Sequence, residues 1–378
     1  MNLCIIVIQY KNKQEVSASR VHQATDPERN LNTISEAVDL NALTHWMDSQ
    51  NLGSGDISNA HLLTGGTQNI LLQFDRAGRS YVLRRPPVHT RVNSNKTMQR
   101  EAKVLSALAG SKVPHPGFIA ACEDTEVLGA NFYLMEPIIG FNVLNSLPEL
   151  HKSSEEMQRR MAFSHIEALT ALGEVDYKAV GLEDFGKIEG YLTRQAPRWL
   201  DQLERYKKYP EWPGLGNAES IDTIARWLDD NCPSTFEPGV LHGDAHFGNV
   251  MFKFDSGEVA ALIDWELATI GDPLIDLGWI IATWPEPDGT DTLVLEGADW
   301  DVRPSIEELI EHYGKHSHRD LSNITWYGVL GCFKLAIILE GTYARYCAGK
   351  APKDVAERLH DSALRLIARA LKLIGESK

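Results

Sequence analysis

The sequence has little of three features that would place it in a specialised class of protein. It contains only five cysteines in 378 residues, an odd number with no closely spaced pair, so neither a disulfide framework nor a zinc site is predicted. Basic residues number 37 against 52 acidic ones, and the net charge of -15 argues against a general nucleic-acid-binding protein, whose surface is basic. The apolar run at residues 3–8 is far shorter than the roughly 20 residues that span a bilayer. We therefore expect a cytoplasmic protein without a nucleic-acid or membrane partner.

The first thirty residues carry no functional pattern. Residues 9–30 are polar and aperiodic, and the chain start lacks the basic residues and cleavage site of a secretory signal. Residues 1–30 are therefore predicted to be a disordered leader. Organised sequence begins at residue 31, after which Leu40, Leu43 and Met47 recur at helical spacing. The remaining length is enough for two lobes around a cleft, since domains run to roughly 100–200 residues.

The stretch at residues 240–266 carries the strongest functional pattern in the chain. It reads Val-Leu-His-Gly-Asp-Ala-His-Phe-Gly-Asn-Val and, after an interval, Leu-Ile-Asp-Trp-Glu. In phosphoryl transfer, one Asp on a loop orients the attacking hydroxyl, an Asn on the same loop binds Mg²⁺, and a later Asp bridges Mg²⁺ to the phosphates. Asp244, Asn249 and Asp264 have the spacing for these three roles. The pattern predicts an ATP- and Mg²⁺-dependent kinase that phosphorylates a small-molecule hydroxyl group.

This stretch resembles the catalytic loop and the metal-binding Asp of the aminoglycoside phosphotransferase and choline kinase family, relatives of the protein kinases. The sequence Gly-Asp-Pro-Leu-Ile-Asp-Leu-Gly at residues 271–278 also resembles that family. By this resemblance, Asp276 supports the catalytic loop and takes no part in the chemistry. The resemblance implies a bilobal α+β fold with a small β-rich N-lobe at 31–136, a hinge at 137–140 and a larger helical C-lobe at 141–378.

The N-lobe has a candidate phosphate-binding loop. Three strand-like runs occupy residues 61–63, 69–74 and 80–84, and Gly65 and Gly66 lie between the first two. Consecutive glycines let backbone N–H groups approach phosphate oxygens closely. A Gly-Gly pair between strands is also a common hairpin turn. The position of the pair just before a basic strand end favours the phosphate-binding interpretation.

The family's strand lysine, which pairs with the nucleotide phosphates, is missing. Tyr-Val-Leu-Arg-Arg stands at residues 81–85, and strand alternation makes Arg84 the best substitute. A guanidinium is permanently charged and binds phosphate oxygens through two N–H groups, so Arg84 can keep the role. Glu101, on a helix expected at 98–109, would hold Arg84 in place. The alternatives are a solvent-facing strand residue and an exposed helix carboxylate.

The segment at residues 131–140 resembles the family's hinge between the lobes. By position, the backbone C=O of Glu136 and the backbone N–H of Ile138 would bind adenine, and Met135 would limit the back of the pocket. Pro137 has no N–H and is therefore not the donor. The rest of the chain is predicted to be mostly helical, with helices at 157–172, 191–206, 221–231, 305–313, 322–341 and 355–373. Strands are expected at 239–241, 250–254 and 259–263.

The acceptor is the least determined part of the prediction. Residues 81–87, 114–116 and 190–199 resemble a branch of the family that includes the kinase-like domains of acyl-CoA dehydrogenase family members ten and eleven. That resemblance implies a hydroxyacyl-CoA or another hydroxylated metabolite as the acceptor. Arg194 and Arg198 are expected four residues apart on one helix face, where they would meet an anionic substrate or simply face solvent. The alternatives are an aminoglycoside or amino-alcohol kinase, or a nucleotide-binding pseudoenzyme.

Two further residues near the motif have open roles. Protein kinases place a Lys two residues after the catalytic Asp, whereas this chain has His246. Its imidazole would either face the transferred phosphate, with a charge that depends on pH, or orient the loop through hydrogen bonds. Glu266, two residues after Asp264, would reach a second metal ion or the substrate, or remain a loop carboxylate. The sequence does not indicate an oligomeric state.

Overall fold

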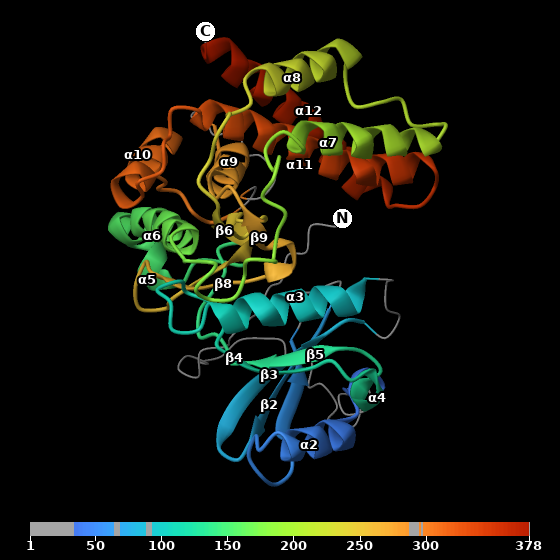
Figure 1. Cartoon of the computed structure of the whole chain (residues 1–378), viewed down its shortest axis with the longest axis vertical. Helices are drawn as coiled ribbons and strands as arrows, with labels where there is room; N and C mark the ends of the chain where they lie inside the picture. Colours follow the sequence, from blue (N-terminus) through green and yellow to red (C-terminus); the bar gives the residue numbers. More distant parts are fainter. Residues whose placement is uncertain (1–33, 64–68, 88–92, 287–294, 296–297, 378) are drawn as a thin grey trace.

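The computed structural model describes residues 34–63, 69–87, 93–286, 295 and 298–377. Figure 1 shows a β-sheet part and a larger helical part, with helix α3 (Ser94–Ala107) lying between them. The fold is therefore α+β, with the sheet in the N-terminal part of the chain, which confirms the predicted fold class. The predicted leader lies outside the described residues.

The N-terminal sheet has five antiparallel strands in the order β1-β2-β3-β5-β4. Its strands are β1 (Ser58–Leu62), β2 (Ile70–Arg76), β3 (Arg79–Arg85), β4 (Phe118–Cys122) and β5 (Phe132–Met135). The short helix α4 (Thr125–Leu128) connects β4 to β5.

The two faces of this sheet bury their apolar side chains in different cores. Leu83 packs with Leu43 and Met47 of helix α2 (Leu40–Ser49) on one face. Val82, one residue earlier, packs on the opposite face with Leu105 of α3. Because strand side chains alternate, Arg84 shares the face of Val82 and is directed toward α3 and the helical part. This parity places its guanidinium beside the catalytic motif.

The helical part is built around its longest helices. Helix α11 (Ile324–Cys347) packs against both α9 (Leu274–Thr283) and α12 (Lys353–Glu376). The surrounding helices are α5 (Glu149–Lys152), α6 (Glu155–Gly173), α7 (Gln195–Glu204), α8 (Ala218–Asp230) and α10 (Ile306–His316). Within the described part of the chain, α11 is the one helix long and apolar enough to cross a membrane, and 89% of its apolar window is buried inside the protein.

Two small two-stranded antiparallel sheets hold the catalytic motif on the helical part. Strand β6 (Gly239–Leu241) pairs with β9 (Thr269–Gly271), and β7 (Val250–Phe252) pairs with β8 (Val259–Leu262). The motif therefore begins at the end of β6, passes through the β7–β8 hairpin and returns along β9. This path brings its early and late residues together.

The structure differs from the sequence-based expectations at several elements. The helix expected from residue 191 begins at Gln195, and Pro197 is tolerated because it lies in the first turn, where its missing N–H has no intrahelical partner. Helix α9 was not among the helices expected from periodicity, because all ten of its residues are buried and it has no polar face to create a helical period. Strands β4 and β9 were also not expected. The bounds of the other long helices differ from the expected ones by a few residues at one or both ends, and α11 ends at Cys347 instead of residue 341.

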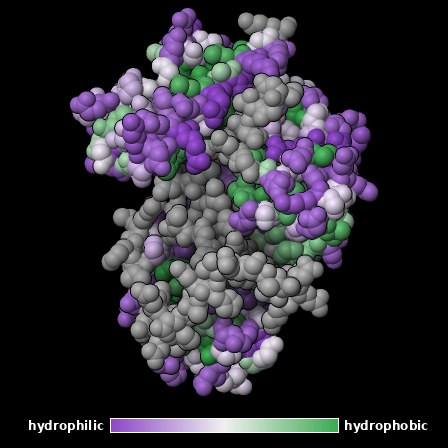
Figure 2. All heavy atoms as spheres, turned by 180° about the vertical axis from the view of Figure 1, so that it is seen from behind, coloured by the Kyte–Doolittle hydropathy of each residue, from purple (hydrophilic) through white to green (hydrophobic). Residues whose placement is uncertain are grey.

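The described surface is mainly hydrophilic. Figure 2, which shows the back of the molecule, has hydrophilic side chains over most of the coloured surface of the helical part, with apolar ones scattered among them. Large apolar side chains exposed in the described ranges are Ile139, Leu150 and Val355.

Helices α9 and α11 approach each other closely at two glycines. A Cβ atom on Gly278 would lie 2.3 Å from the backbone oxygen of Tyr327, and one on Gly331 would lie 2.4 Å from the backbone oxygen of Gly278. We predict that Gly278→Ala lowers the free energy of unfolding by about 1–3 kcal/mol, because backbone atoms must move apart. Urea denaturation of the purified chain measures this change.

Gly375→Ala is the matched control, since a Cβ there meets nothing within 4 Å in helix α12. That change should be neutral or stabilise the chain by up to about 1 kcal/mol, because alanine favours helix. Equal stability of the two alanine variants would contradict the close helix crossing.

Candidate active site

A buried carboxylate fixes the start of the catalytic loop. Asp276, near the beginning of α9, accepts hydrogen bonds from the backbone N–H groups of His242 at 2.6 Å and Gly243 at 2.8 Å. Burial raises the pKa of Asp276 to about 6, against the effect of these two bonds. Gly243 has φ +82°, and a Cβ there would lie 2.5 Å from the backbone oxygen of Leu267, so the turn requires glycine. Asp276 therefore supports the catalytic loop through the loop's backbone, as expected from the sequence.

His242 connects this loop to the strand that precedes Asp264. Its side-chain Nε2 lies 2.9 Å from the backbone oxygen of Ile263, and its ring packs 4.8 Å from that of Trp265. Since a carbonyl only accepts, Nε2 carries the proton. Burial lowers the pKa of His242 to about 4, so the ring is neutral at neutral pH. The His of the motif is thus a structural link between its two halves.

Asp244, His246 and Asn249 form one contiguous group. The side-chain Nδ2 of Asn249 donates to the backbone oxygen of Asp244 at 2.9 Å and to its Oδ2 at 3.2 Å. The backbone N–H of Gly248 donates to Nδ1 of His246 at 3.0 Å, which places the ring proton on Nε2. That nitrogen is 3.6 Å from Oδ1 of Asp244. The geometry favours the interpretation in which His246 orients the loop.

Asp264 lies opposite this group in a left-handed backbone conformation, with φ 66° and ψ 65°. Its Oδ1 is 2.9 Å from Nη2 of Arg84. Burial is the main reason that its pKa is raised, although Arg84 opposes the shift. Within the described part of the chain, Oδ2 of Asp264 and Oδ1 of Asn249 are both buried and have no hydrogen-bond partner. Buried oxygens without partners are costly in a dry site, so these two atoms are suited to hold a cation.

Arg84 is the centre of a buried charge network. Its Nε lies 2.7 Å from Oε2 of Glu101, and Tyr133 donates its hydroxyl to the same carboxylate at 2.8 Å. Burial alone would lower the pKa of Arg84, but the charges of Glu101 and Asp264 raise it well above its usual value. The structure therefore excludes both alternatives, a solvent-facing strand residue and an exposed helix carboxylate. It also adds a contact that the sequence did not indicate, the pair between Arg84 and Asp264.

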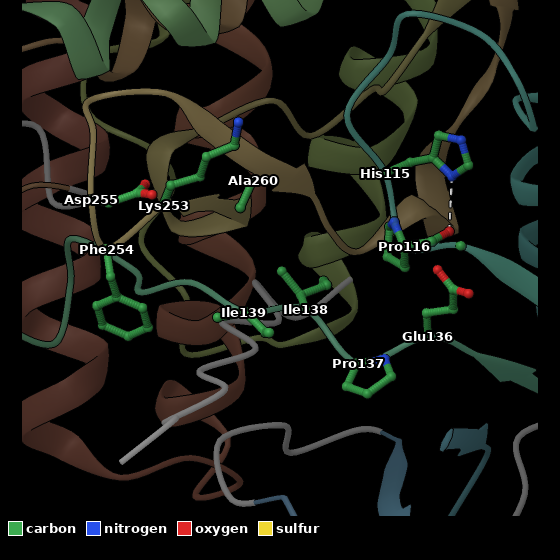
Figure 3. A pocket seen from close by; sticks show the side chains of 11 residues that line it. His115, Pro116, Glu136, Pro137, Ile138, Ile139, Lys253, Phe254, Asp255 and Ala260 are labelled. Carbon is green, nitrogen blue, oxygen red and sulfur yellow. Dashed lines mark hydrogen bonds between the residues drawn. The ribbon is translucent and has the colours of Figure 1, made fainter. Parts of the chain in front are cut away.

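The three residues expected at the hinge, Met135, Glu136 and Ile138, line two neighbouring cavities. Figure 3 shows Glu136 and Ile138 beside a cavity of about 520 Å³, whose other walls come from residues 115–117 and from the β7–β8 hairpin. Met135 and Ile138 line a much smaller cavity of about 20 Å³ together with Arg84 and Asp264. The smaller cavity is too small to hold a nucleotide base. Gly65 and Gly66 lie outside the described residues.

A third cavity, of about 330 Å³, opens beside the catalytic loop. It is lined by Gly243 and Glu266, and by five basic side chains: Arg100, Lys187, Arg194, Arg198 and Lys334. Arg194 and Arg198 thus reach the same cavity from the first turn of α7, where Arg194 is the N-cap residue and its backbone oxygen accepts from the N–H of Arg198. Arg194 directs its guanidinium to the backbone oxygens of Lys187 and Glu189, whereas the side chain of Arg198 is exposed. We name this space the basic cavity.

Lys334 was not identified from the sequence. Its ammonium donates to the backbone oxygen of Gly243 at 3.0 Å and lies 4.1 Å from the ring centre of Trp279. Burial lowers its pKa to about 8, while the charges of Asp244 and Asp276 oppose that shift. A sequence signal did exist, because Lys334 is an isolated charge inside the apolar stretch 324–339. A buried charge in such a stretch indicates a partner on another element.

Glu266 lies between the charge network and the basic cavity. Its carboxylate is within 4.8 Å of those of Glu101 and Asp264. Burial, followed by the charges of these two neighbours, raises its pKa to about 7. Glu266 therefore has access to both the predicted metal position and the basic cavity, as the sequence allowed.

Comparison with known proteins gives a family and a set of relatives. A model of the phosphotransferase enzyme family matches residues 60–309. Acyl-CoA dehydrogenase family member 11 of Gallus gallus is 29% identical over 319 residues, which cover 82% of this chain and 40% of that protein. Family member 10 of Mus musculus is 30% identical over 306 residues, which cover 76% of this chain and 28% of that protein. The chain thus spans less than half the length of these curated relatives.

Solved structures show a similar fold over nearly their whole length. A Ralstonia eutropha protein assigned to the aminoglycoside phosphotransferases has a TM-score of 0.72 and 27% identity, with 89% of this chain and 99% of that chain covered. Aminoglycoside phosphotransferase APH(4)-Ia, solved with ADP and hygromycin B, has a TM-score of 0.54 and 15% identity, with 87% and 98% covered. The second likeness shows the fold alone.

We predict that Arg84→Met lowers the free energy of unfolding by about 3–5 kcal/mol, because it leaves two buried carboxylates without their counter-ion. Arg79→Met is the matched control on the same strand. Arg79 pairs with Glu136 at 2.8 Å, but its side chain is 50% exposed, against 3% for Arg84. Exposed pairs contribute about 0–1 kcal/mol, so the control should change little. Similar losses in the two variants, measured by denaturant unfolding, would contradict the importance of the buried network.

Proposed function

The chain belongs to the phosphotransferase enzyme family, and we propose that it transfers the γ-phosphate of ATP to a hydroxyl group of an anionic small molecule. A hydroxyacyl-CoA is the acceptor class that the relatives support. The observation that carries the proposal is the catalytic loop around Asp244: Asn249, which bonds to Asp244, has one of the two buried oxygens suited to a cation, and Gly243, which precedes Asp244, lines the basic cavity. One part of this loop thus suits a metal–nucleotide complex, and another adjoins a cavity suited to an anionic acceptor.

Asp244 has the role of orienting the acceptor. Asn249 donates to Oδ2 of this carboxylate from within the same loop, so the direction of the carboxylate is set before the substrate arrives. The acceptor hydroxyl would donate to this carboxylate and give up its proton as the new oxygen–phosphorus bond forms. Holding the reacting groups in position supplies much of the rate enhancement in such reactions.

The nucleotide side of the site is defined by Asn249, Asp264 and Arg84. Asn249 Oδ1 and Asp264 Oδ2 are the atoms that would hold Mg²⁺, and a bound ion would neutralise charge on the β- and γ-phosphates. Arg84 remains charged in the folded protein and would pair with phosphate oxygens, steadied by Glu101. Glu136 and Ile138 would receive the base at the hinge, and Gly65 and Gly66 would cover the phosphates. The match of residues 60–309 to the phosphotransferase enzyme family supports this assignment of a nucleotide.

The charge of the basic cavity supports an anionic acceptor. Five basic side chains and the single carboxylate of Glu266 line it, in a chain with a net charge of -15. A polycationic aminoglycoside would be attracted by carboxylates, which this cavity does not provide in excess. The alternative of a nucleotide-binding pseudoenzyme is disfavoured because Asp244, Asn249 and Asp264 are all present with their buried contacts. Arg84, in place of the family lysine, keeps a cation at the same site.

We predict that Asp244→Ala lowers the rate of phosphate transfer by about 10²–10⁴-fold, since it removes the proton acceptor, and leaves ATP binding nearly intact. Asp264→Ala should instead remove the effect of Mg²⁺ on ATP binding. ADP release and calorimetry with ATP, with and without Mg²⁺, separate the two outcomes. Asp222→Ala, an exposed position on α8, is the control and should behave as wild type. Wild-type turnover by the Asp244 variant would exclude Asp244 from the mechanism.

The acceptor class is tested by ADP release over hydroxyacyl-CoAs, amino alcohols, sugars and aminoglycosides. We predict a preference for the acyl-CoAs, and that Arg198→Glu raises the Michaelis constant for the best of them while leaving that for ATP unchanged. Added salt should weaken acceptor binding, because exposed charges are screened over about 8–10 Å. Arg226→Glu on the exposed face of α8 is the matched charge reversal. A wild-type preference for aminoglycosides would exclude the anionic acceptor and leave the phosphotransferase assignment in place.

A further inference from the structure

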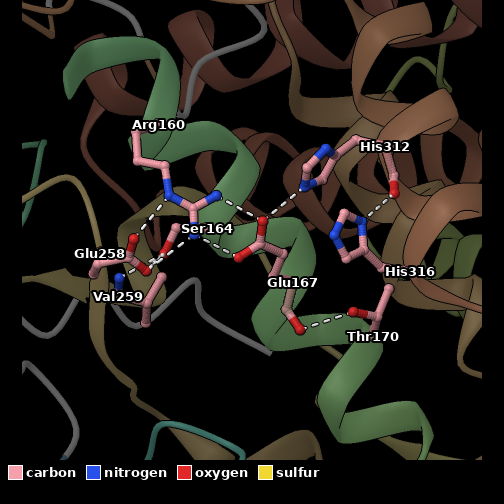
Figure 4. Close-up of polar contacts among 8 residues, drawn as sticks. All are labelled: Arg160, Ser164, Glu167, Thr170, Glu258, Val259, His312 and His316. Carbon is pink, nitrogen blue, oxygen red and sulfur yellow. Dashed lines mark hydrogen bonds and ion pairs between the residues drawn. The ribbon is translucent and has the colours of Figure 1, made fainter. Parts of the chain in front are cut away.

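We propose that Glu167, His312 and His316 form a binding site for a divalent transition-metal ion, with Zn²⁺ as the best fit. One ligand atom from each residue lies within 4.8 Å of the other two. Figure 4 shows both imidazole rings directed toward the carboxylate, with α6 supplying Glu167 and α10 supplying the two histidines. None of the three residues lines the cavity beside Glu136 and Ile138 or the basic cavity, so this site is separate from the proposed phosphotransferase site.

The two histidines are arranged as a pair by their helix. His312 and His316 are four residues apart on α10, so they share one face of the helix, and their ring centres are 4.2 Å apart. Histidines at this spacing are a common way for a helix to bind zinc. The helix begins at a reciprocal capping box between Ser305 and Glu308, which fixes its first turn.

The hydrogen bond of His316 leaves the correct nitrogen for a metal ion. Its Nδ1 lies 2.8 Å from the backbone oxygen of His312. Because that oxygen only accepts, Nδ1 carries the proton and Nε2 of the neutral ring has its lone pair available. Metal-binding histidines typically donate their other ring nitrogen to a carbonyl or carboxylate in this way.

Glu167 is held as an ionised carboxylate beside His312. Arg160 donates to both of its oxygens at 2.6 Å, and Nε2 of His312 lies 2.8 Å from Oε1. The hydrogen bond from Arg160 is the main reason that the pKa of Glu167 falls to about 2. The carboxylate is therefore charged at all ordinary pH values, and its orientation is fixed by a second residue, as is usual for metal-binding carboxylates.

The ligand set selects the type of ion. Two imidazoles and one carboxylate suit Zn²⁺ and similar transition metals, whereas Mg²⁺ and Ca²⁺ prefer sites made of oxygen atoms. Zinc bonds of about 2.0–2.2 Å place tetrahedral ligand atoms roughly 3.3 Å apart, so a small rotation of the exposed His316 ring would complete the site. The ion would take the place of the His312 proton that now bonds to Glu167. Solvent would supply the fourth ligand and the ion would join α10 to α6.

The experiment uses the full chain, titrated with Zn²⁺ by calorimetry and with Co²⁺ by visible absorption, in excess Mg²⁺. We expect one Zn²⁺ per chain, and a Co²⁺ spectrum of nitrogen and oxygen ligation without a thiolate charge-transfer band, which distinguishes this site from the cysteines. His312→Ala and His316→Ala should each weaken binding by at least about tenfold, the loss expected even when an outer partner of a metal ligand is removed.

His318→Ala is the matched control, because His318 is a nearby exposed histidine that pairs with Glu174 and Glu237. It should bind Zn²⁺ as wild type does, and far-ultraviolet circular dichroism checks that all variants are folded. Two results would overturn the proposal: wild-type affinity in both His312→Ala and His316→Ala, or no stoichiometric Zn²⁺ binding by the wild-type chain. In either case, the three side chains form only an ion pair between two helices.

Discussion

One buried guanidinium, that of Arg84, pairs with two carboxylates and so joins the N-terminal sheet to the helical part of the protein. Arg84 extends from the N-terminal sheet, Glu101 from the helix between the lobes, and Asp264 from the end of a hairpin on the helical part. Each charge is removed from water, so none is stable there without the others. A lysine has a single charged nitrogen, whereas the guanidinium can bond to both carboxylates at once. The departure from the family pattern at Arg84 is thus accommodated by the geometry around it.

The local charge of the basic cavity is opposite in sign to the net charge of the chain. Acidic side chains outnumber basic ones over the chain as a whole, yet basic side chains dominate the cavity beside the catalytic loop. Net charge therefore says little about the acceptor, because a substrate responds to the local field. Lys334 contributes to this field from a buried helix, where its charge is screened less by salt than that of the exposed Arg198.

The sequence predicted the fold and the local motif because both depend on short-range patterns. Asp244, Asn249 and Asp264 lie close together as their spacing implied, and the family resemblance is confirmed by the match at residues 60–309. What could not be predicted depends on contacts between distant elements. Lys334 meets Gly243 across 91 positions, and the pair between Arg84 and Asp264 spans 180. Periodicity did not indicate helix α9 for a different reason, since a fully buried helix has no polar face that would recur with the helical period.

The close crossing of α9 and α11 fixes the separation of Asp276 and Lys334, two side chains of the candidate active site that both bond to Gly243. Gly278 is two residues after Asp276, which holds the catalytic loop, and Gly331 is three residues before Lys334, which bonds to that loop. The direct backbone contact between the two glycines therefore acts as a fixed spacer for the ammonium and the carboxylate. The packing of the two helices and the positions of these two side chains therefore depend on the same contact. A side chain larger than hydrogen at either glycine would push the two helices apart and shift Lys334 relative to the loop that Asp276 holds.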